Sequence, residues 1–252
     1  MKISTLKISN DLTFSFVGPP LSAGPLPTMF YFALSSEDSF GTDPYNQPVR
    51  FLDSDELRIF TVTIPGHETG LKPENAITLW AEKFRQGHDL LSPFFQSVKE
   101  GIDYLIKNNL ILEEKLGAMG LSRGAFVACH IAALCPAIRL ILGFAPLTCL
   151  NHAKEFQGGP DVSSFNLEHL IPSLYDRIIR FYIGNQDTRV GTEKAFKLVH
   201  DLATEAKNCR IRSAPIELTI GPSIGYEGHG TAPHVFQAGV DWIKKLWFKK
   251  NG

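Results

Sequence analysis

The stretch K-L-G-A-M-G-L-S-R-G-A-F-V-A-C-H-I-A-A-L-C-P, residues 115–136, decides the fold. It opens with residues 115–121, an apolar run that predicts a short buried strand. Small and apolar residues then fill 123–134, and this segment stops before Pro136. It predicts a helix that is apolar nearly all round, as a helix buried against a sheet must be. A tight turn at Ser122 therefore joins a strand to a buried helix.

The turn carries Gly120-Leu121-Ser122-Arg123-Gly124, which matches the pattern G-x-S-x-G. A side chain at the tip of so sharp a turn takes a strained backbone, and the positions two before and two after it need to be glycine or similarly small. An ordinary glycine-rich turn is the alternative interpretation. The strand before the turn and the buried helix after it favour a nucleophile at Ser122.

With these residues the chain resembles the α/β-hydrolase superfamily, most specifically at the Ser122 turn. The resemblance implies an α/β fold with a mostly parallel sheet of about eight strands, helices on both faces, and a triad in the chain order Ser, then Asp or Glu, then His. Within that superfamily the chain is loosely similar to cap-poor serine esterases, to dienelactone-hydrolase-like enzymes and to catalytic domains of the prolyl-oligopeptidase type. Catalytic domains of the prolyl-oligopeptidase type usually carry a separate propeller, for which 252 residues leave no room.

Asp187 is the candidate acid of the triad. Three residues separate it from the end of the predicted buried strand 178–183, at the carboxyl edge where open α/β sheets hold their sites. A turn Asp that hydrogen-bonds its own backbone is the alternative. The chain order and the position at a strand end favour the triad acid. Asp161, Glu155 and Asp176 are fallback candidates, placed in mid-loop or at a helix end.

His229 is the candidate base. It lies in G-Y-E-G-H-G, residues 225–230, between a predicted last strand at 216–220 and a closing helix at 233–249. The flanking glycines let the backbone bring the imidazole close to the nucleophile. His234 competes with it only five positions on, but it begins the closing helix. The usual position of the family's histidine, in the loop after the last strand, favours His229.

The backbone N–H groups of Arg123 and of Ser35 or Ser36 are the candidate oxyanion hole. The resemblance implies one donor from the residue after the nucleophile and one from the loop after the third strand, where the chain departs from the usual H-G motif and reads L-S-S-E. The Arg123 side chain either holds a substrate carboxylate or pairs with an acidic residue at the helix N-terminus. We favour the pairing, because the helix dipole disfavours an unpartnered cation there.

The remaining elements fit one domain over residues 1–252. An edge hairpin is predicted at 3–8 and 12–17, and the other elements follow from hydrophobic periodicity. They comprise strands at 28–34, 58–64 and 140–144, a polar loop at 35–55, helices at 74–84, 92–108 (with Ser92 as N-cap) and 192–206, and a connection at 146–176 long enough for a small lid at most.

Composition excludes several classes of function. Apolar residues make up 44% and charged residues 20%, and the net charge of −1 predicts no nucleic-acid partner and no binding to acidic membranes.

The chain has no dinucleotide or phosphate-loop motif, no H-E-x-x-H and no zinc-like cysteine spacing, so no cofactor or metal is expected. The four cysteines read as free thiols. The sequence has no signal-like or membrane-spanning run, which predicts a cytoplasmic protein. We expect a monomer or a homodimer.

These observations predict a serine hydrolase that cleaves a small-molecule carboxylic ester or thioester through an acyl-enzyme on Ser122. A peptidase or amidase of the same fold is one alternative. A ligand- or partner-binding protein without catalysis is another, and the irregular loop around Ser35 is the feature that supports it.

Overall fold

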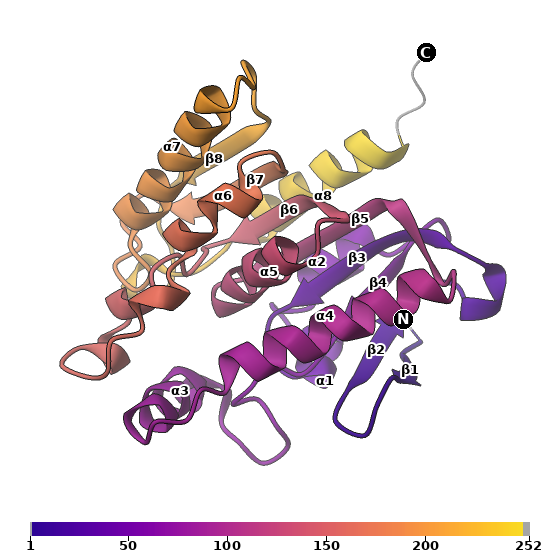
Figure 1. The fold of residues 1–252 in the computed structure, drawn as a ribbon, viewed down its shortest axis with the longest axis horizontal. Coiled ribbons are helices and arrows are strands. Elements are labelled where there is room, and N and C mark those ends of the chain that lie inside the picture. The colour runs from indigo at the N-terminus through magenta and orange to yellow at the C-terminus, as the bar shows by residue number, and fades with distance from the viewer. Residues whose placement is uncertain (1, 249–252) are drawn as a thin grey trace.

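The computed structural model describes residues 2–248, and within them the chain forms one sheet in the order β1-β2-β4-β3-β5-β6-β7-β8 (Figure 1). β1 (Ser4–Lys7) and β2 (Thr13–Val17) form an antiparallel hairpin at one edge, and β2 runs antiparallel to β4 (Arg58–Thr61). All other pairings are parallel. The predicted edge hairpin and the mostly parallel α/β sheet are both confirmed.

The inner parallel strands are buried on both faces at their centres, which explains their apolar sequences, whereas the edge strand at residues 216–221 is partly exposed. In the strand that follows the hairpin, Phe30 and Phe32 face one core while Met29 and Tyr31 face the other. The remaining strands are β3 (Leu26–Phe32), β5 (Ile111–Leu121), β6 (Ile138–Phe144), β7 (Ile178–Gly184) and β8 (Ile216–Gly221).

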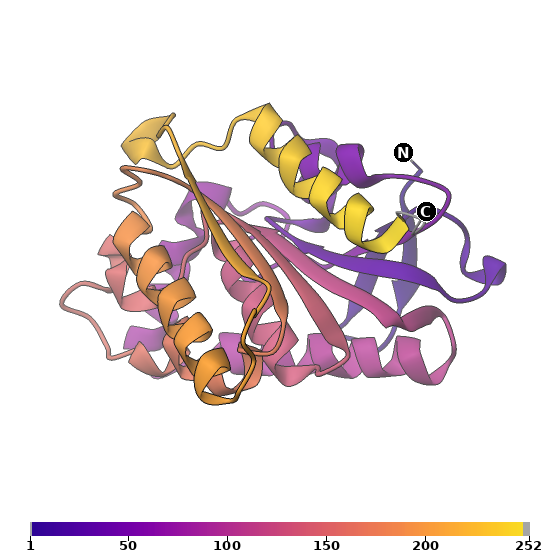
Figure 2. The same ribbon diagram turned by 90° about the horizontal axis from the view of Figure 1, so that it is seen from above.

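Helices cover both faces of the sheet (Figure 2). One face carries α3 (Ala76–Arg85), α4 (Leu91–Lys107), α5 (Arg123–Leu134) and α7 (Thr192–Asn208). The other carries α1 (Ser36–Gly41), α2 (Gln47–Leu52) and α8 (Pro233–Phe248). The helix after the Ser122 turn is buried from Gly124 to Ala132, as its composition predicts. Lys249, the predicted end of the closing helix, lies outside the described residues.

The prediction of a polar loop at 35–55 was wrong, because this segment contains α1 and α2. The Ser35 hydroxyl accepts a hydrogen bond from the Asp38 N–H at 3.0 Å and so caps the first of these helices. Phe40, Val49 and Leu52 are buried in the second core. Each helix has six residues, too few for a hydrophobic period to show.

Two further details differ from expectation. The N-cap prediction at Ser92 was wrong: the helix begins one residue earlier, and the Asp89 carboxylate accepts the N–H groups of Leu91 and Ser92 at 2.8 and 3.0 Å. Phe196 on α7 and Leu246 on α8 are 58% and 46% exposed, although each lies at helical spacing from other apolar residues of the same helix. The stripes of α7 and α8 are therefore narrower than the periodicity suggests.

The connection 146–176 forms only short elements, so the expectation of a small lid is confirmed. Four 3-10 segments and α6 (Ile171–Leu174) follow one another there, at Leu150–His152, Lys154–Phe156, Ser163–Phe165 and Leu167–Leu170. Other 3-10 segments lie at Leu21–Ala23, Pro73–Asn75 and Tyr226–Gly228. None of the helices in residues 2–248 has the length and apolar character that crossing a membrane requires.

Candidate active site

Ser122 stands at the junction of β5 and α5 with φ 56° and ψ −118°, a backbone conformation that is rare for a residue with a side chain. The two glycines of the motif make this turn possible. A Cβ on Gly120 would lie 2.2 Å from the carbonyl carbon of Gly124, and a Cβ on Gly124 would lie 1.9 Å from the carbonyl oxygen of Phe32. Only glycine fits both positions, which is the physical content of the G-x-S-x-G pattern.

The structure brings Ser122, His229 and Asp187 together in one chain of hydrogen bonds. The Ser122 Oγ lies 2.8 Å from Nε2 of His229, and Nδ1 of His229 lies 2.7 Å from Oδ2 of Asp187. A carboxylate only accepts, so Nδ1 carries the proton and Nε2 is the acceptor for the serine hydroxyl. This arrangement lets the imidazole remove the hydroxyl proton.

Asp187 also makes the backbone contacts of a turn residue. Its Oδ1 accepts hydrogen bonds from the N–H groups of Arg189 and Val190, each at 3.1 Å, while Oδ2 contacts the imidazole. Asp187 is therefore both a turn residue, through its Oδ1, and the partner of the imidazole, through its Oδ2. With 2% of its surface exposed, Asp187 is held rigidly beside His229.

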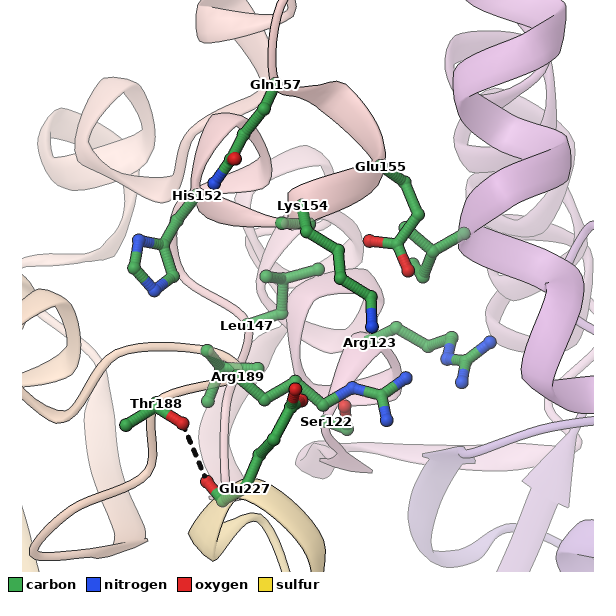
Figure 3. A pocket seen from close by; sticks show the side chains of 13 residues that line it. Ser122, Arg123, Leu147, His152, Lys154, Glu155, Gln157, Thr188, Arg189 and Glu227 are labelled. Carbon is green, nitrogen blue, oxygen red and sulfur yellow. Dashed lines mark hydrogen bonds between the residues drawn. The ribbon is translucent and has the colours of Figure 1, made fainter.

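The loops that carry the acid and the histidine are tied to each other. The N–H and the hydroxyl of Thr188 both donate to the carbonyl oxygen of Glu227, at 3.0 and 3.2 Å (Figure 3). Gly228, with φ 71°, lies so close that a Cβ there would meet the Gln186 carbonyl oxygen at 2.3 Å. The glycine next to His229 thus permits the close approach that the sequence predicts.

The competing candidates lie elsewhere or have other partners. His234 is exposed on the first turn of α8 and lines a separate cavity beside β8. Asp161 accepts a hydrogen bond from the Ser163 N–H, and Asp176 pairs with Arg139 and Arg177. Glu155 lines a cavity beside Ser122, but the carboxylate that contacts His229 is that of Asp187.

Two cavities meet at Ser122. The larger, of about 430 Å³, is lined by His229, Leu34, Tyr45 and Phe236 among others. The smaller, of about 140 Å³, is lined mainly by the lid and by the loop after β7 (Figure 3). Ser122, Arg123 and Arg189 are the residues that line both.

Sequence reasoning missed two cationic residues of this cleft, Arg189 and Lys154. The first lies two residues after Asp187, at the carboxyl edge of the sheet, and that position is a signal that could have identified it. The second comes from the lid, where no periodicity places it.

The candidate oxyanion donors differ in the cavity that they line and in whether their N–H groups already have a hydrogen-bond partner. Arg123 is the first residue of α5, so its N–H belongs to the free donors of a helix N-terminus. The Ser36 N–H already donates to the Thr63 hydroxyl at 3.1 Å, and both Ser35 and Ser36 line a neighbouring cavity. Leu34 lines the larger cavity with Ser122, and its N–H donates to the Ser39 hydroxyl at 3.2 Å.

The Arg123 side chain has no acidic partner, contrary to the favoured expectation. Its Nη1 donates to the Pro73 carbonyl oxygen at 2.9 Å and lies 3.2 Å from Nε2 of His67, and none of the ion pairs in residues 2–248 includes it. Burial, with the nearby charge of Arg189, lowers the pKa of Arg123 to about 10, so it is a cation at neutral pH.

His67 is a neutral partner of this arginine. Burial, followed by the charge of Arg123, lowers the pKa of His67 to about 4. Its Nε2 therefore accepts from the guanidinium, and the ring proton resides on Nδ1. His67 thus holds the arginine by a hydrogen bond and adds no second charge.

Among residues 2–248, no cluster of three or more His, Cys, Asp or Glu side chains is arranged to hold a metal ion. The four cysteines are free, and Cys129 and Cys135 are buried. The prediction of free thiols is confirmed.

Comparison with known proteins gives matches of structure alone. No protein-family model and no curated protein matches the sequence. The structure is similar to TT1662 from Thermus thermophilus, with a TM-score of 0.69 and 14% identity over 99% of this chain and 100% of that one. It is similar to the Pyrococcus furiosus esterase Pf2001, with a TM-score of 0.66 and 15% identity over 98% of this chain and 93% of that one.

The structure also resembles the acylaminoacyl peptidase of Pyrococcus horikoshii. The TM-score is 0.65, with 13% identity over 100% of this chain. The chain spans 42% of the length of that peptidase. At these identities the likeness establishes a shared fold.

Proposed function

The chain has the α/β-hydrolase fold, and on that premise we propose that it is a serine hydrolase that cleaves a carboxylic ester or thioester through an acyl-enzyme on Ser122. The hydrogen-bonded series Ser122–His229–Asp187 is the observation that carries the proposal. The strained backbone of the serine supports it, because such strain is retained where it presents a reactive group.

The proposed reaction begins when Nε2 of His229 takes the hydroxyl proton of Ser122. The oxygen attacks the substrate carbonyl, and the imidazolium then gives its proton to the leaving group as the acyl-enzyme forms. Water hydrolyses this ester by the same steps. Asp187 orients the imidazole and stabilises its positive charge without taking the proton.

The Arg123 N–H is one proposed donor to the oxyanion. We assign the second donor to Leu34, since this residue lines the cavity of Ser122 whereas Ser35 and Ser36 line a neighbouring cavity. The Leu34 N–H donates to the Ser39 hydroxyl at 3.2 Å, and in the proposed reaction it exchanges this partner for the oxyanion. Each such donor contributes about 10²- to 10³-fold to kcat.

An ester is preferred over a peptide as the substrate. The likeness to the Pyrococcus furiosus esterase extends over 93% of that enzyme, whereas more than half of the Pyrococcus horikoshii peptidase has no counterpart in this chain. Turnover of p-nitrophenyl esters and of p-nitroanilides with the same acyl groups separates the two. A higher kcat/KM on the anilides would overturn the preference.

The test of the nucleophile is covalent labelling. The purified protein is incubated with a fluorophosphonate, and the intact mass is read for the wild type, Ser122→Ala, His229→Ala and the control Ser164→Ala, which changes an exposed serine of the lid. One adduct is expected on the wild type and on the control, and none on the other two. A folded wild type without an adduct would overturn the proposal and favour a ligand-binding protein.

A further inference from the structure

We propose that the substrate carries a carboxylate near its scissile carbonyl, and that Arg123 and Arg189 bind it. This rests on the proposed function, and it defines the class of ester that the site accepts. An anionic group of the substrate is meant, distinct from the oxyanion that forms during the reaction.

The position of the two arginines is the first argument. They line both cavities that meet at Ser122, so a group bound between them lies beside the nucleophile. Arg189 reaches in from the loop after β7, and Lys154 reaches in from the lid (Figure 3). Three cations from three elements thus surround one end of the cleft.

The absence of counterions is the second argument. Among the ion pairs of residues 2–248, none includes Arg123, Arg189 or Lys154. Glu155 and Glu227 also line the smaller cavity, but neither is in ion-pair contact with these cations. An anion from outside can therefore contact both guanidinium groups.

Two acidic residues line the larger cavity, Asp38 and Glu74, and among the described residues neither forms an ion pair with Arg123 or Arg189. The carboxylate of Asp38 accepts hydrogen bonds from the hydroxyl groups of Ser35 and Thr42. It is therefore not oriented as a partner for either arginine.

The hydrogen bonding of Arg123 is the third argument. Pro73 and the neutral His67 hold only Nη1, and among the described residues the other two guanidinium nitrogens have no recorded partner. A guanidinium fork fixed at one corner is ready to bind a carboxylate with the remaining donors. An anion between the two arginines also relieves the repulsion between them, which contributes to the lowered pKa of Arg123.

The first experiment measures selectivity with two pairs of esters. On the acyl side, 4-nitrophenyl hydrogen glutarate is compared with its neutral amide, 4-nitrophenyl 4-carbamoylbutanoate. On the alcohol side, 3-acetoxybenzoate is compared with 3-acetoxybenzamide. We expect kcat/KM of the wild type to be at least about tenfold higher for the anionic member of one pair, since a charge-assisted hydrogen bond is worth that much or more. No preference in either pair overturns the proposal.

Variants assign the preference to the arginine. Arg189→Gln is expected to lower the anionic-to-neutral ratio by about 10- to 100-fold, and Arg189→Lys by less. Lys207→Gln removes one charge from an exposed site on α7 and is the matched control. A ratio that is the same in Arg189→Gln and in this control would contradict the assignment. Added NaCl should lower the wild-type ratio, which tests the charge without any substitution.

Binding to Ser122→Ala separates this proposal from the proposed function. Methyl hydrogen glutarate with its neutral analogue methyl 4-carbamoylbutanoate, and 3-acetoxybenzoate with 3-acetoxybenzamide, are titrated into this variant by calorimetry. Tighter binding of the anion in one pair supports the carboxylate site even if fluorophosphonate labelling fails. Equal binding within both pairs, with labelling intact on the wild type, overturns the carboxylate site and leaves the hydrolase standing.

Discussion

Gly124 and Phe32 are in such close contact that a single methyl group cannot be placed between them: a Cβ on Gly124 would lie 1.9 Å from the Phe32 carbonyl oxygen. The contact presses the first turn of α5 against the end of β3. It sets the distance between the Arg123 N–H and the turn at Leu34, and therefore the width of the proposed oxyanion hole.

Gly124→Ala should consequently destabilise the protein. Either α5 or β3 must shift, and we expect a loss of at least about 2 kcal/mol in the free energy of unfolding. For a chain of this size each kcal/mol lowers Tm by about 2–4 °C. Gly41→Ala is the matched control, because a Cβ at Gly41 meets nothing within 4 Å. Equal melting temperatures for the two variants would show that the contact is not rigid.

Asp187→Asn should abolish most of the activity while leaving the fold intact. The asparagine oxygen can still accept the Arg189 and Val190 N–H groups, but the amide favours the wrong tautomer of His229. We expect kcat on an activated ester to fall by about 10⁴-fold, the effect of the same substitution in serine proteases. Asp161→Asn, at the fallback acid of the lid, should keep wild-type kcat. Full activity in Asp187→Asn would exclude the proposed role.

Stability should depend on pH through His67 and His130. Burial is the main cause that lowers the pKa of each to about 4, below the usual value near 6.5. The unfolded chain binds these protons first, so stability is full above about pH 6.5 and is lost as the pH falls toward 4. Urea denaturation at pH 7 and pH 5 measures the loss.

The histidine variants assign this loss. His67→Gln and His130→Gln should each flatten the pH dependence, whereas the exposed His88→Gln should leave it as in the wild type. The glutamine at 67 can still accept from Arg123, so the comparison removes the titration and keeps the hydrogen bond. A pH dependence as steep as that of the wild type in both buried variants would contradict the assignment.

Arg58, the first residue of β4, should be essential for the stability of the protein. Its guanidinium is fully buried and donates to the carbonyl oxygens of Pro19, Pro20 and Leu110 at 2.8, 2.6 and 2.7 Å. Arg58→Met would leave three carbonyl groups without a donor, at an expected cost of at least about 3 kcal/mol. Arg50→Met, at an arginine whose side chain is 55% exposed, should cost less than about 0.5 kcal/mol. Urea midpoints of the two variants make the comparison.

The sequence predicts the strands and the candidate triad because both depend on local patterns. Buried parallel strands read as apolar runs, and Asp187 follows the end of one such run, whereas His229 follows the partly exposed last strand, β8. Parallel order then places both residues at the edge that holds Ser122.

The features that the sequence does not predict either lack a hydrophobic period or bring together residues that are distant in the chain. The helices α1 and α2 are too short to show a hydrophobic stripe, and only the cap at Ser35 marks the start of the first. Arg189 and Lys154 meet at Ser122 through the folding of two loops, which spacing along the chain does not encode. The actual partners of Arg123, a carbonyl group and a neutral ring, are likewise invisible in composition.

Two hydrogen bonds from Thr188 to the Glu227 carbonyl oxygen tie the loop of the proposed acid to the loop of the proposed base. The proposed base and acid lie on the β7–β8 side and the proposed nucleophile lies at the end of β5, with β6 as the strand between β5 and β7. Slippage of the sheet along β6 would therefore part His229 from Ser122 and leave its bond to Asp187 whole. In such a folded but inactive form, the hydrogen bond between His229 and Asp187 would be present and the one between His229 and Ser122 would be absent.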